Sequence, residues 1–149
     1  MKHLLFLCSG NYYRSRFAEA VFNHAAAQRG LPWRAFSRGL AIWMVDGDLS
    51  PWTEEALQQR GIDRALTGAT RVALTEPDLQ RAAKIIAVKE TEHRPMMRDQ
   101  FPDWEHRVDY WTIDDLDCAS SEEALPLLEA RVKALAAALA EEPRHSKQM

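Results

Sequence analysis

The chain has 149 residues, which is the usual size of one domain and enough to bury a core without disulfides or metal ions. Its 46% hydrophobic and 28% charged residues are typical of a soluble globular protein, and no apolar run approaches the roughly 20 residues that span a bilayer. The formal net charge of −3 argues against a dedicated nucleic-acid binder, which would carry a strongly basic surface. We therefore expect one domain over residues 1–142, a polar tail at 143–149, and neither a membrane nor a nucleic acid as partner.

The cysteine content points to a reducing compartment. Cys8 and Cys118 could form at most one bridge, which is not the disulfide framework of a small secreted protein. The opening apolar run from Leu4 to Cys8 is shorter than the roughly 7–15 residues of a secretory signal. We predict a cytoplasmic protein.

The first half of the chain alternates strand-like and helix-like segments. In chain order it predicts a strand over Leu4–Leu7, a helix from Ser15 to Arg29, a strand over Trp33–Ser37, a loop from Arg38 to Asp48 and a helix between Ser50 and Gly61. Gly30 can end the first helix in the left-handed conformation, and Ser50 with Pro51 is a typical helix start. Strand, tight loop and helix thus follow one another directly at the N-terminus.

The second half continues the alternation. It predicts a capping box of Thr75 and Asp78 before a helix over Leu79–Ala83, a strand over Lys84–Val88, a helix over Thr91–Asp99, a strand over Arg107–Trp111 and a long helix capped by Ser120 and Glu123 that runs through Leu139. Such alternation is typical of βαβ units, so we expect an α/β fold with helices on both faces of a parallel sheet.

The segment between the first strand and the first helix carries the chemistry. It reads Cys8-Ser9-Gly10-Asn11-Tyr12-Tyr13-Arg14-Ser15, a cysteine followed by five residues, an arginine and a serine. In such a loop the backbone N–H groups and the helix N-terminus cradle a phosphate dianion without a metal ion, and the same field favours a cysteine thiolate. We therefore predict a phosphate-binding loop with Cys8 as nucleophile.

The other loop residues fit supporting roles. The planar guanidinium of Arg14 can bind two phosphate oxygens at once. Ser15 can donate a hydrogen bond to the sulfur of Cys8, Asn11 can order the loop, and Gly10 permits backbone angles that a side chain forbids. An ordinary βα turn with a buried cysteine is the competing interpretation.

These residues resemble the low-molecular-weight protein tyrosine phosphatases. The family's loop reads Cys-x-Gly-Asn-x-x-Arg-Ser and continues into Ala-Glu-Ala-Val-Phe, which is matched here by Ala18–Phe22. The similarity extends to Ser37-Arg38-Gly39 and to Ser50–Asp63, and Trp43 falls where the family has a tryptophan that lines its pocket. The resemblance implies a three-layer α/β/α fold with a four-stranded parallel sheet (phosphatase I-like), a cysteinyl-phosphate intermediate and no cofactor.

The resemblance also implies a general acid after the last strand. Alignment of Trp111 and the spacing place Asp115 at the family's aspartate, with Leu116 where the family has proline. Asp114 and Asp117 remain alternatives, and any of these aspartates could instead cap the final helix or face water.

Several positions depart from the family. Position 13 is tyrosine rather than a second cysteine, Lys89 stands where aspartate is common, and Ala69 stands where a histidine is common. Tyr12 is bulky, whereas a small threonine there accompanies phosphoarginine specificity, so Tyr12 argues against that substrate. Trp111 is expected in the core.

The leading hypothesis is a metal-independent phosphatase that acts on a phosphorylated protein or a small aryl phosphate. His93 and His106 lack the paired spacing of a metal site, so we predict no metal. We expect a monomer or a weak dimer. The alternatives are a weakly active phosphate-binding or phosphoprotein-binding module, and an arsenate reductase, for which the distant Cys118 is poorly suited.

Overall fold

The computed structural model of the protein describes residues 1–116 and 118–142. At its centre is a four-stranded sheet in which every pairing between strands is parallel, with the order β2-β1-β3-β4. The strands are β1 (Lys2–Cys8), β2 (Trp33–Gly39), β3 (Lys84–Ala87) and β4 (Asp109–Tyr110). The parallel four-stranded sheet expected from the sequence is confirmed.

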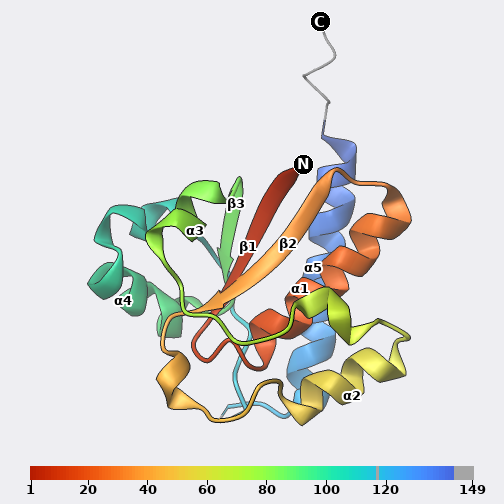
Figure 1. Cartoon of the computed structure of the whole chain (residues 1–149), viewed down its shortest axis with the longest axis horizontal. Helices are drawn as coiled ribbons and strands as arrows, with labels where there is room; N and C mark the ends of the chain where they lie inside the picture. The colour runs from red at the N-terminus through yellow and green to blue at the C-terminus, as the bar shows by residue number, and fades with distance from the viewer. Residues whose placement is uncertain (117, 143–149) are drawn as a thin grey trace, which may run out of the picture.

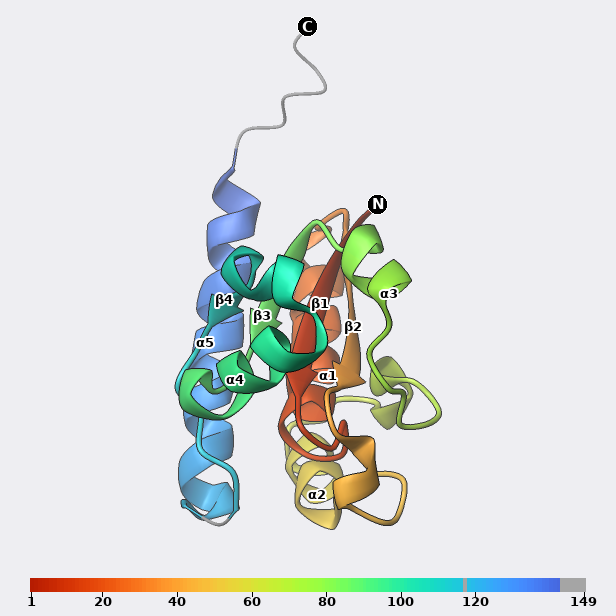
Figure 2. The same ribbon diagram turned by 90° about the vertical axis from the view of Figure 1, so that its left-hand side faces the viewer.

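Within residues 1–116 and 118–142 the chain forms five α-helices around this sheet. They are α1 (Arg14–Arg29), α2 (Pro51–Gln59), α3 (Glu76–Arg81), α4 (Glu90–Gln100) and α5 (Ser121–Glu141). Figures 1 and 2 show α3 and α4 on one side of the sheet and α1 and α5 on the other, so the molecule has the three layers of an α/β/α fold. The connections in this described part of the chain also contain three 3-10 helices, η1 (Ile42–Met44), η2 (Arg64–Thr67) and η3 (Pro102–Arg107).

Strand β1 is buried on both faces. Leu4 and Phe6 pack with the core under α1 and α5, whereas Leu5 and Leu7 pack with the core under α3 and α4. A strand covered by helices on both faces reads as a continuous apolar run, which explains the sequence from Leu4 to Leu7. This strand delivers its last residue, Cys8, to the middle of the sheet's carboxyl edge.

The predicted helix boundaries hold where local signals set them. Gly30 ends α1 with φ at 65°, which a side chain would disfavour. The Ser50 hydroxyl accepts a hydrogen bond from the N–H of Trp52 at the start of α2. Ser120 and Glu123 form the predicted capping box of α5.

Three predicted elements differ from the structure, and the first is the loop predicted from Arg38 to Asp48, which contains the end of β2 and the 3-10 helix η1. The last strand is Asp109–Tyr110 rather than Arg107–Trp111, because Arg107 closes η3 and the chain after Tyr110 leaves regular pairing. The N–H of Trp111 still donates to the carbonyl of Ala87, but an antiparallel bridge between Lys89 and Thr112 follows immediately. The third helix begins at Glu76 and stops at Arg81 rather than spanning Leu79–Ala83, because Thr75 caps it at the N-terminus and residue 82 is extended.

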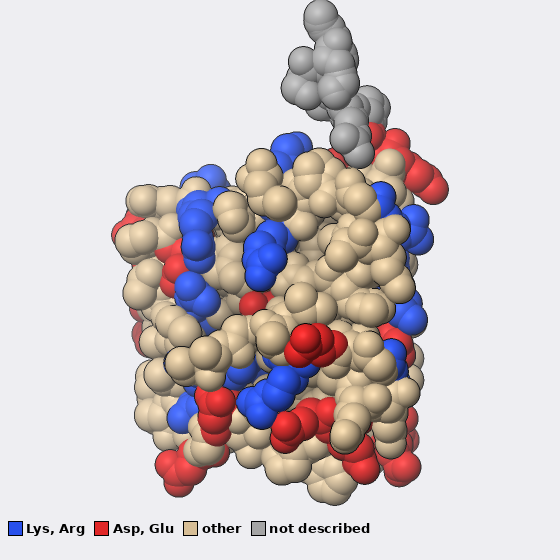
Figure 3. Space-filling view, turned by 45° about the vertical axis from the view of Figure 1, so that its right-hand side comes forward, with Lys and Arg blue, Asp and Glu red and all other residues tan. Residues whose placement is uncertain are grey.

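The helices of the described residues mix polar and apolar side chains, and one face of the molecule mixes charges of both signs. Within residues 1–116 and 118–142, none of the helices combines the length and apolar character that crossing a membrane requires. On the face drawn in Figure 3, lysine and arginine side chains are mixed with aspartate and glutamate. The predicted polar tail at 143–149 lies outside the described residues.

Candidate active site

The loop that joins β1 to α1 lies at the carboxyl edge of the sheet, beside the starts of α2 and of the segment after β4 (Figure 1). In the strand order, the connection from β1 leads to β2 on one side, while β3 lies on the other. Open α/β sheets bind ligands at this kind of switch point. Cys8 and Arg14, the first and last functional residues of the loop, are 2% and 1% exposed.

A directed chain of hydrogen bonds reaches the sulfur of Cys8. The Asn11 side-chain oxygen accepts from the N–H of Val72 at 2.8 Å, which fixes the orientation of the amide. Its Nδ2 group then donates its two hydrogens, one to Ser15 Oγ at 2.9 Å and one to Ser37 Oγ at 3.0 Å. Because Ser15 accepts from Asn11, its own hydrogen is free to point at Cys8 Sγ, 2.9 Å away. Ser15 is thus placed to donate a hydrogen bond to the sulfur of Cys8.

The same chain continues to a buried carboxyl group. Ser37 Oγ donates to Glu19 Oε1 at 2.6 Å, and Thr67 Oγ1 donates to the same oxygen at 3.0 Å. Burial raises the pKa of Glu19 to about 6, although hydrogen bonds from Ser37 and Thr67 act in the opposite direction. Glu19 belongs to the matched sequence run, but its burial and its link to Cys8 could not be read from the pattern.

The two Nη groups of Arg14 contact three protein groups. Its Nη1 donates to the carbonyl of Ile113 at 2.9 Å, while Nη2 lies 3.0 Å from a Glu92 oxygen and 3.3 Å from an Asp115 oxygen. Its Nε is buried and has no partner among the described residues. Burial acts to lower the pKa of Arg14, but the negative charges of Cys8 and the two carboxylates outweigh it and raise the pKa. The guanidinium is therefore permanently charged and keeps one buried donor for a ligand.

Glu92 and His93, from the first turn of α4, complete the site and were not predicted as part of it. Glu92 accepts hydrogen bonds from Arg14 and from the hydroxyl of Ser9, and His93 Nε2 lies 3.1 Å from the Ser9 oxygen. His93 is completely buried and satisfied by hydrogen bonds, as expected for a histidine without metal-ligand spacing. No local pattern reveals a contact between residues 78 positions apart.

The protonation of His93 follows from its partners. The backbone N–H of Lys89 donates to His93 Nδ1 at 3.1 Å, so a neutral ring carries its hydrogen on Nε2. Burial lowers the pKa of His93 below its ordinary value, which favours this neutral ring. With Nε2 protonated, His93 cannot accept a proton from Ser9. The Ser9–His93 pair is therefore not a nucleophile with its base.

Two aspartates of the predicted acid loop have different partners. Asp115 turns towards Arg14, whereas Asp114 forms an ion pair with Lys89 Nζ at 2.7 Å. This arrangement favours Asp115 over Asp114 as the group that reaches a ligand in the loop. Asp117, the third alternative, lies outside the described residues.

The aromatic residues around the loop differ in exposure. Trp43 stands on η1 with 77% of its surface exposed, and Tyr12 is half-buried beside Gly47. Tyr13 is buried, burial raises its pKa to about 12, and its hydroxyl has no partner within the described chain. Trp111 packs in the core, as predicted. The role of Trp43 as a pocket wall stays a prediction.

Two arginines outside the loop fix its backbone. Buried Arg16 donates to the carbonyl of Asn11 at 3.4 Å and to that of Asp48 at 3.0 Å. Arg71 donates to the carbonyl of Gly10 at 3.3 Å and to those of Ile42 and Gly47, both at 2.6 Å. Asn11 itself has φ at 51°, a left-handed conformation that asparagine tolerates better than most residues. The loop and η1 are thus tied together.

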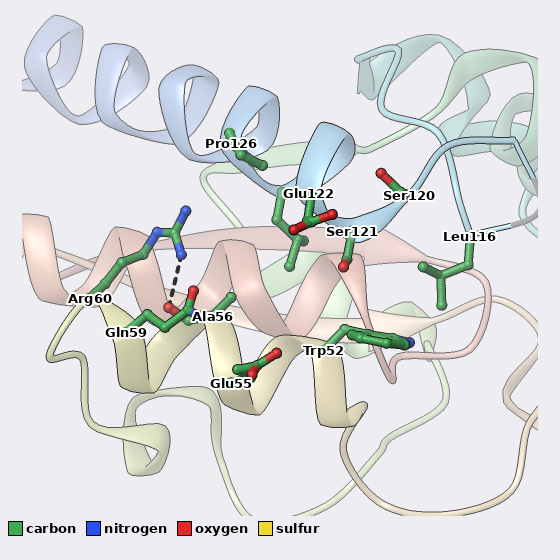
Figure 4. Close-up of a pocket in the computed structure, with 11 residues that line it drawn as sticks. Trp52, Glu55, Ala56, Gln59, Arg60, Leu116, Ser120, Ser121, Glu122 and Pro126 are labelled. Carbon is green, nitrogen blue, oxygen red and sulfur yellow. Dashed lines mark hydrogen bonds between the residues drawn. The ribbon is translucent and has the colours of Figure 1, made fainter.

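A pocket of about 650 Å³ lies beside the acid loop rather than over Cys8. Figure 4 shows Trp52 and Gln59 of α2 on one side and the start of α5 on the other, with Leu116 at one end. Its lining contains neither Cys8 nor Arg14, so it is separate from the chemistry described above. Cys118 is exposed with a free thiol, and no cluster of metal-ligating side chains occurs within residues 1–116 and 118–142.

Comparison with known proteins identifies relatives over nearly the whole chain. The model of the family "Low molecular weight phosphotyrosine protein phosphatase" matches residues 3–145. The low molecular weight protein-tyrosine-phosphatase YfkJ of Bacillus subtilis is 36% identical over 90 residues, which are 59% of this chain and 56% of that protein. A protein-arginine-phosphatase of the same organism is 30% identical over 105 residues, 70% of this chain and 67% of that one. The crystal structure of YfkJ superposes with a TM-score of 0.84 at 26% identity and covers 97% of this chain and 98% of that one.

Proposed function

Because the chain belongs to the low molecular weight phosphotyrosine protein phosphatase family, we propose that it hydrolyses phosphomonoesters of the phosphotyrosine type with Cys8 as nucleophile. The Cys8 thiolate attacks phosphorus and the bond to the leaving oxygen breaks, while Asp115 donates a proton to that oxygen. Water then attacks the cysteinyl phosphate, Asp115 accepts a proton from it, and the phosphorus–sulfur bond breaks. Inorganic phosphate and the Cys8 thiolate are the products, and no redox or metal step is needed.

The observation that carries this proposal is the buried Nε of Arg14. A buried donor without a partner costs free energy, and among the described residues none satisfies this one. It belongs to the guanidinium of the loop that also contains Cys8, whose sulfur lies 2.9 Å from Ser15 Oγ. A bound phosphate oxygen would satisfy it. The backbone of Ser9 to Tyr13 would supply the remaining donors.

The substrate would be a phosphorylated protein or a small aryl phosphate. Exposed Trp43 and half-buried Tyr12 offer flat surfaces against which an aryl ring can stack. The arginine-phosphatase relative makes a phosphorylated guanidinium the second candidate substrate. The bulk of Tyr12 favours the aryl group.

The remaining attributes belong to the same proposal. We place the protein in the cytoplasm, as a single domain over residues 1–142 and a monomer or weak dimer that needs no cofactor. Both cysteines are free, which suits a reducing compartment.

The test is turnover of p-nitrophenyl phosphate in the presence of a metal chelator. We expect activity in the native chain, none in Cys8→Ser, and about 10²- to 10⁴-fold lower kcat in Asp115→Asn, the usual contribution of a general acid. Phosphotyrosine and phosphoarginine peptides compared side by side identify the substrate class. Native protein that binds inorganic phosphate without turnover would instead be a binding module, and thiol-dependent reduction of arsenate to arsenite would establish the reductase.

A further inference from the structure

A buried polar cluster joins the phosphate-binding loop to the first turn of α4. Its members are Ser9, Arg14, Glu92 and His93. Ser9 occupies a loop position where the chemistry described above uses only the backbone, yet its side chain is turned to Glu92 and His93. Glu92 is 24% exposed at its side chain, while the other three are nearly or completely buried.

The hydrogen bonds of this cluster run in one direction. The Lys89 N–H donates to His93, and His93 Nε2 then donates to Ser9 Oγ. Ser9 Oγ in turn donates to Glu92, and Glu92 accepts from Arg14 Nη2 at 3.0 and 3.2 Å with its two oxygens. His93 Nε2 also lies 3.3 Å from a Glu92 oxygen, so the Glu92 carboxylate is held by Ser9 and His93 on one side and by Arg14 on the other.

We propose that Glu92 is a positioning residue that fixes the Arg14 guanidinium for phosphate binding, and that Ser9 and His93 hold Glu92 in place. The inference rests on the proposed phosphatase function. Glu92 and the carbonyl of Ile113 restrain the two Nη groups, which leaves the buried Nε as a guanidinium donor without a partner among the described residues.

Glu92 also frees Asp115 for proton transfer. Both carboxylates share Nη2 of Arg14. An acid must be protonated before it acts, and at that moment it no longer neutralises the arginine. Glu92 remains a permanent counter-charge, since burial acts to raise its pKa but its hydrogen bonds and the charge of Arg14 hold the pKa well below the ordinary value.

Glu92→Gln tests the proposal with little change in size. Both Glu92 oxygens contact Arg14 Nη2, so in either orientation of a glutamine amide one N–H group faces an arginine N–H. The matched control is Glu90→Gln, in the same helical turn, where the carboxylate pairs with Arg94 at 3.0 Å on the surface. Ser9→Ala, which removes only a hydroxyl, is the second test variant and carries the test if Glu92→Gln does not fold.

Four quantities are measured for each variant: the Kd for inorganic phosphate by calorimetry, kcat and KM for p-nitrophenyl phosphate, and the thermal midpoint. We expect Glu92→Gln to weaken phosphate binding about tenfold or more, the factor typical of losing a hydrogen bond to a charged group, and to lower kcat/KM at least as much. Ser9→Ala should shift both in the same direction, and Glu90→Gln should match the native protein.

The proposal is overturned if Glu92→Gln binds phosphate as the control does, because Glu92 would then be merely structural. It is equally overturned if phosphate binds more tightly, because Glu92 would then compete with the ligand for Arg14. The phosphate Kd does not depend on turnover. A native chain without phosphatase activity would therefore refute the proposed function while the binding comparison still decides the role of Glu92.

Discussion

The buried carboxyl group of Glu19 provides a quantitative test of the hydrogen-bond chain behind Cys8. Glu19 is 7% exposed, and burial raises its pKa from 4.5 to about 6. Each pKa unit corresponds to about 1.4 kcal/mol at 25 °C, so the ionised form should cost the folded protein about 2 kcal/mol relative to the unfolded chain. The substitution Glu19→Gln removes the ionisable group and keeps an oxygen that can accept from Ser37 and Thr67.

The sign follows from the raised pKa. Below pH 4.5 the group is neutral in both states and costs nothing. As the pH rises from about 4.5 to about 6, the unfolded chain ionises first, and native stability falls relative to a chain with a neutral residue. Glu19→Gln should thus gain stability over the native protein across this window and keep a gain of about 2 kcal/mol at pH 8.

The assay is urea unfolding of both proteins between pH 4 and pH 8 under reducing conditions. A separate thermal melt at neutral pH should show a rise of about 4–8 °C in the midpoint, as expected for about 2 kcal/mol in a chain of this size. Glu129→Gln is a control of opposite sign. Burial acts to raise the pKa of Glu129, but Arg60 and Lys133 outweigh it and lower the pKa, so this substitution should lose stability as the pH rises. A gain for Glu19→Gln that is constant with pH, or that shrinks as pH rises, would refute the reasoning.

Three further predictions address the acid loop, the loop tyrosine and the exposed tryptophan. Asp114→Asn should lower kcat less than about tenfold, far less than Asp115→Asn, because Asp114 pairs with Lys89; equal losses in steady-state assays would reject the assignment of the acid. Tyr13→Phe should raise the free energy of unfolding, measured by urea unfolding, by about 1–3 kcal/mol, because it removes a buried hydroxyl without a partner in the described residues; a loss of stability would contradict that. Trp43→Ala should raise KM for aryl phosphates without changing the thermal midpoint, because the side chain is 77% exposed; an unchanged KM would remove Trp43 from the pocket.

The sequence predicts much of the fold because local signals and the fold agree in most places. The apolar run of β1, the capping residues Ser50 and Ser120, and Gly30 each act within a few residues, and their elements appear where expected. The predicted last strand is longer than β4, because Arg107 belongs to η3 and Trp111 is buried in the core beyond the residues of the strand.

The site was only partly predictable for a related reason. The loop from Cys8 to Ser15 is contiguous, so spacing reveals it. The contact between Arg14 and Glu92 depends on how α4 sits at the end of β3. Glu92 looks like an ordinary acidic residue in a helical first turn, where its negative charge would be favourable in any case. Only the tertiary arrangement distinguishes the two roles.

The backbone contacts of the phosphate-binding loop have a consequence for ligand affinity. Arg16, Arg71 and the N–H of Val72 hold Gly10 and Asn11 in place through bonds that involve only protein groups. The free-energy cost of ordering this loop, which comes from lost conformational entropy, is thus incurred during folding rather than at the moment of binding. A phosphate group meets preorganised donors, so even a small ligand with few other contacts can use most of its interaction energy for affinity.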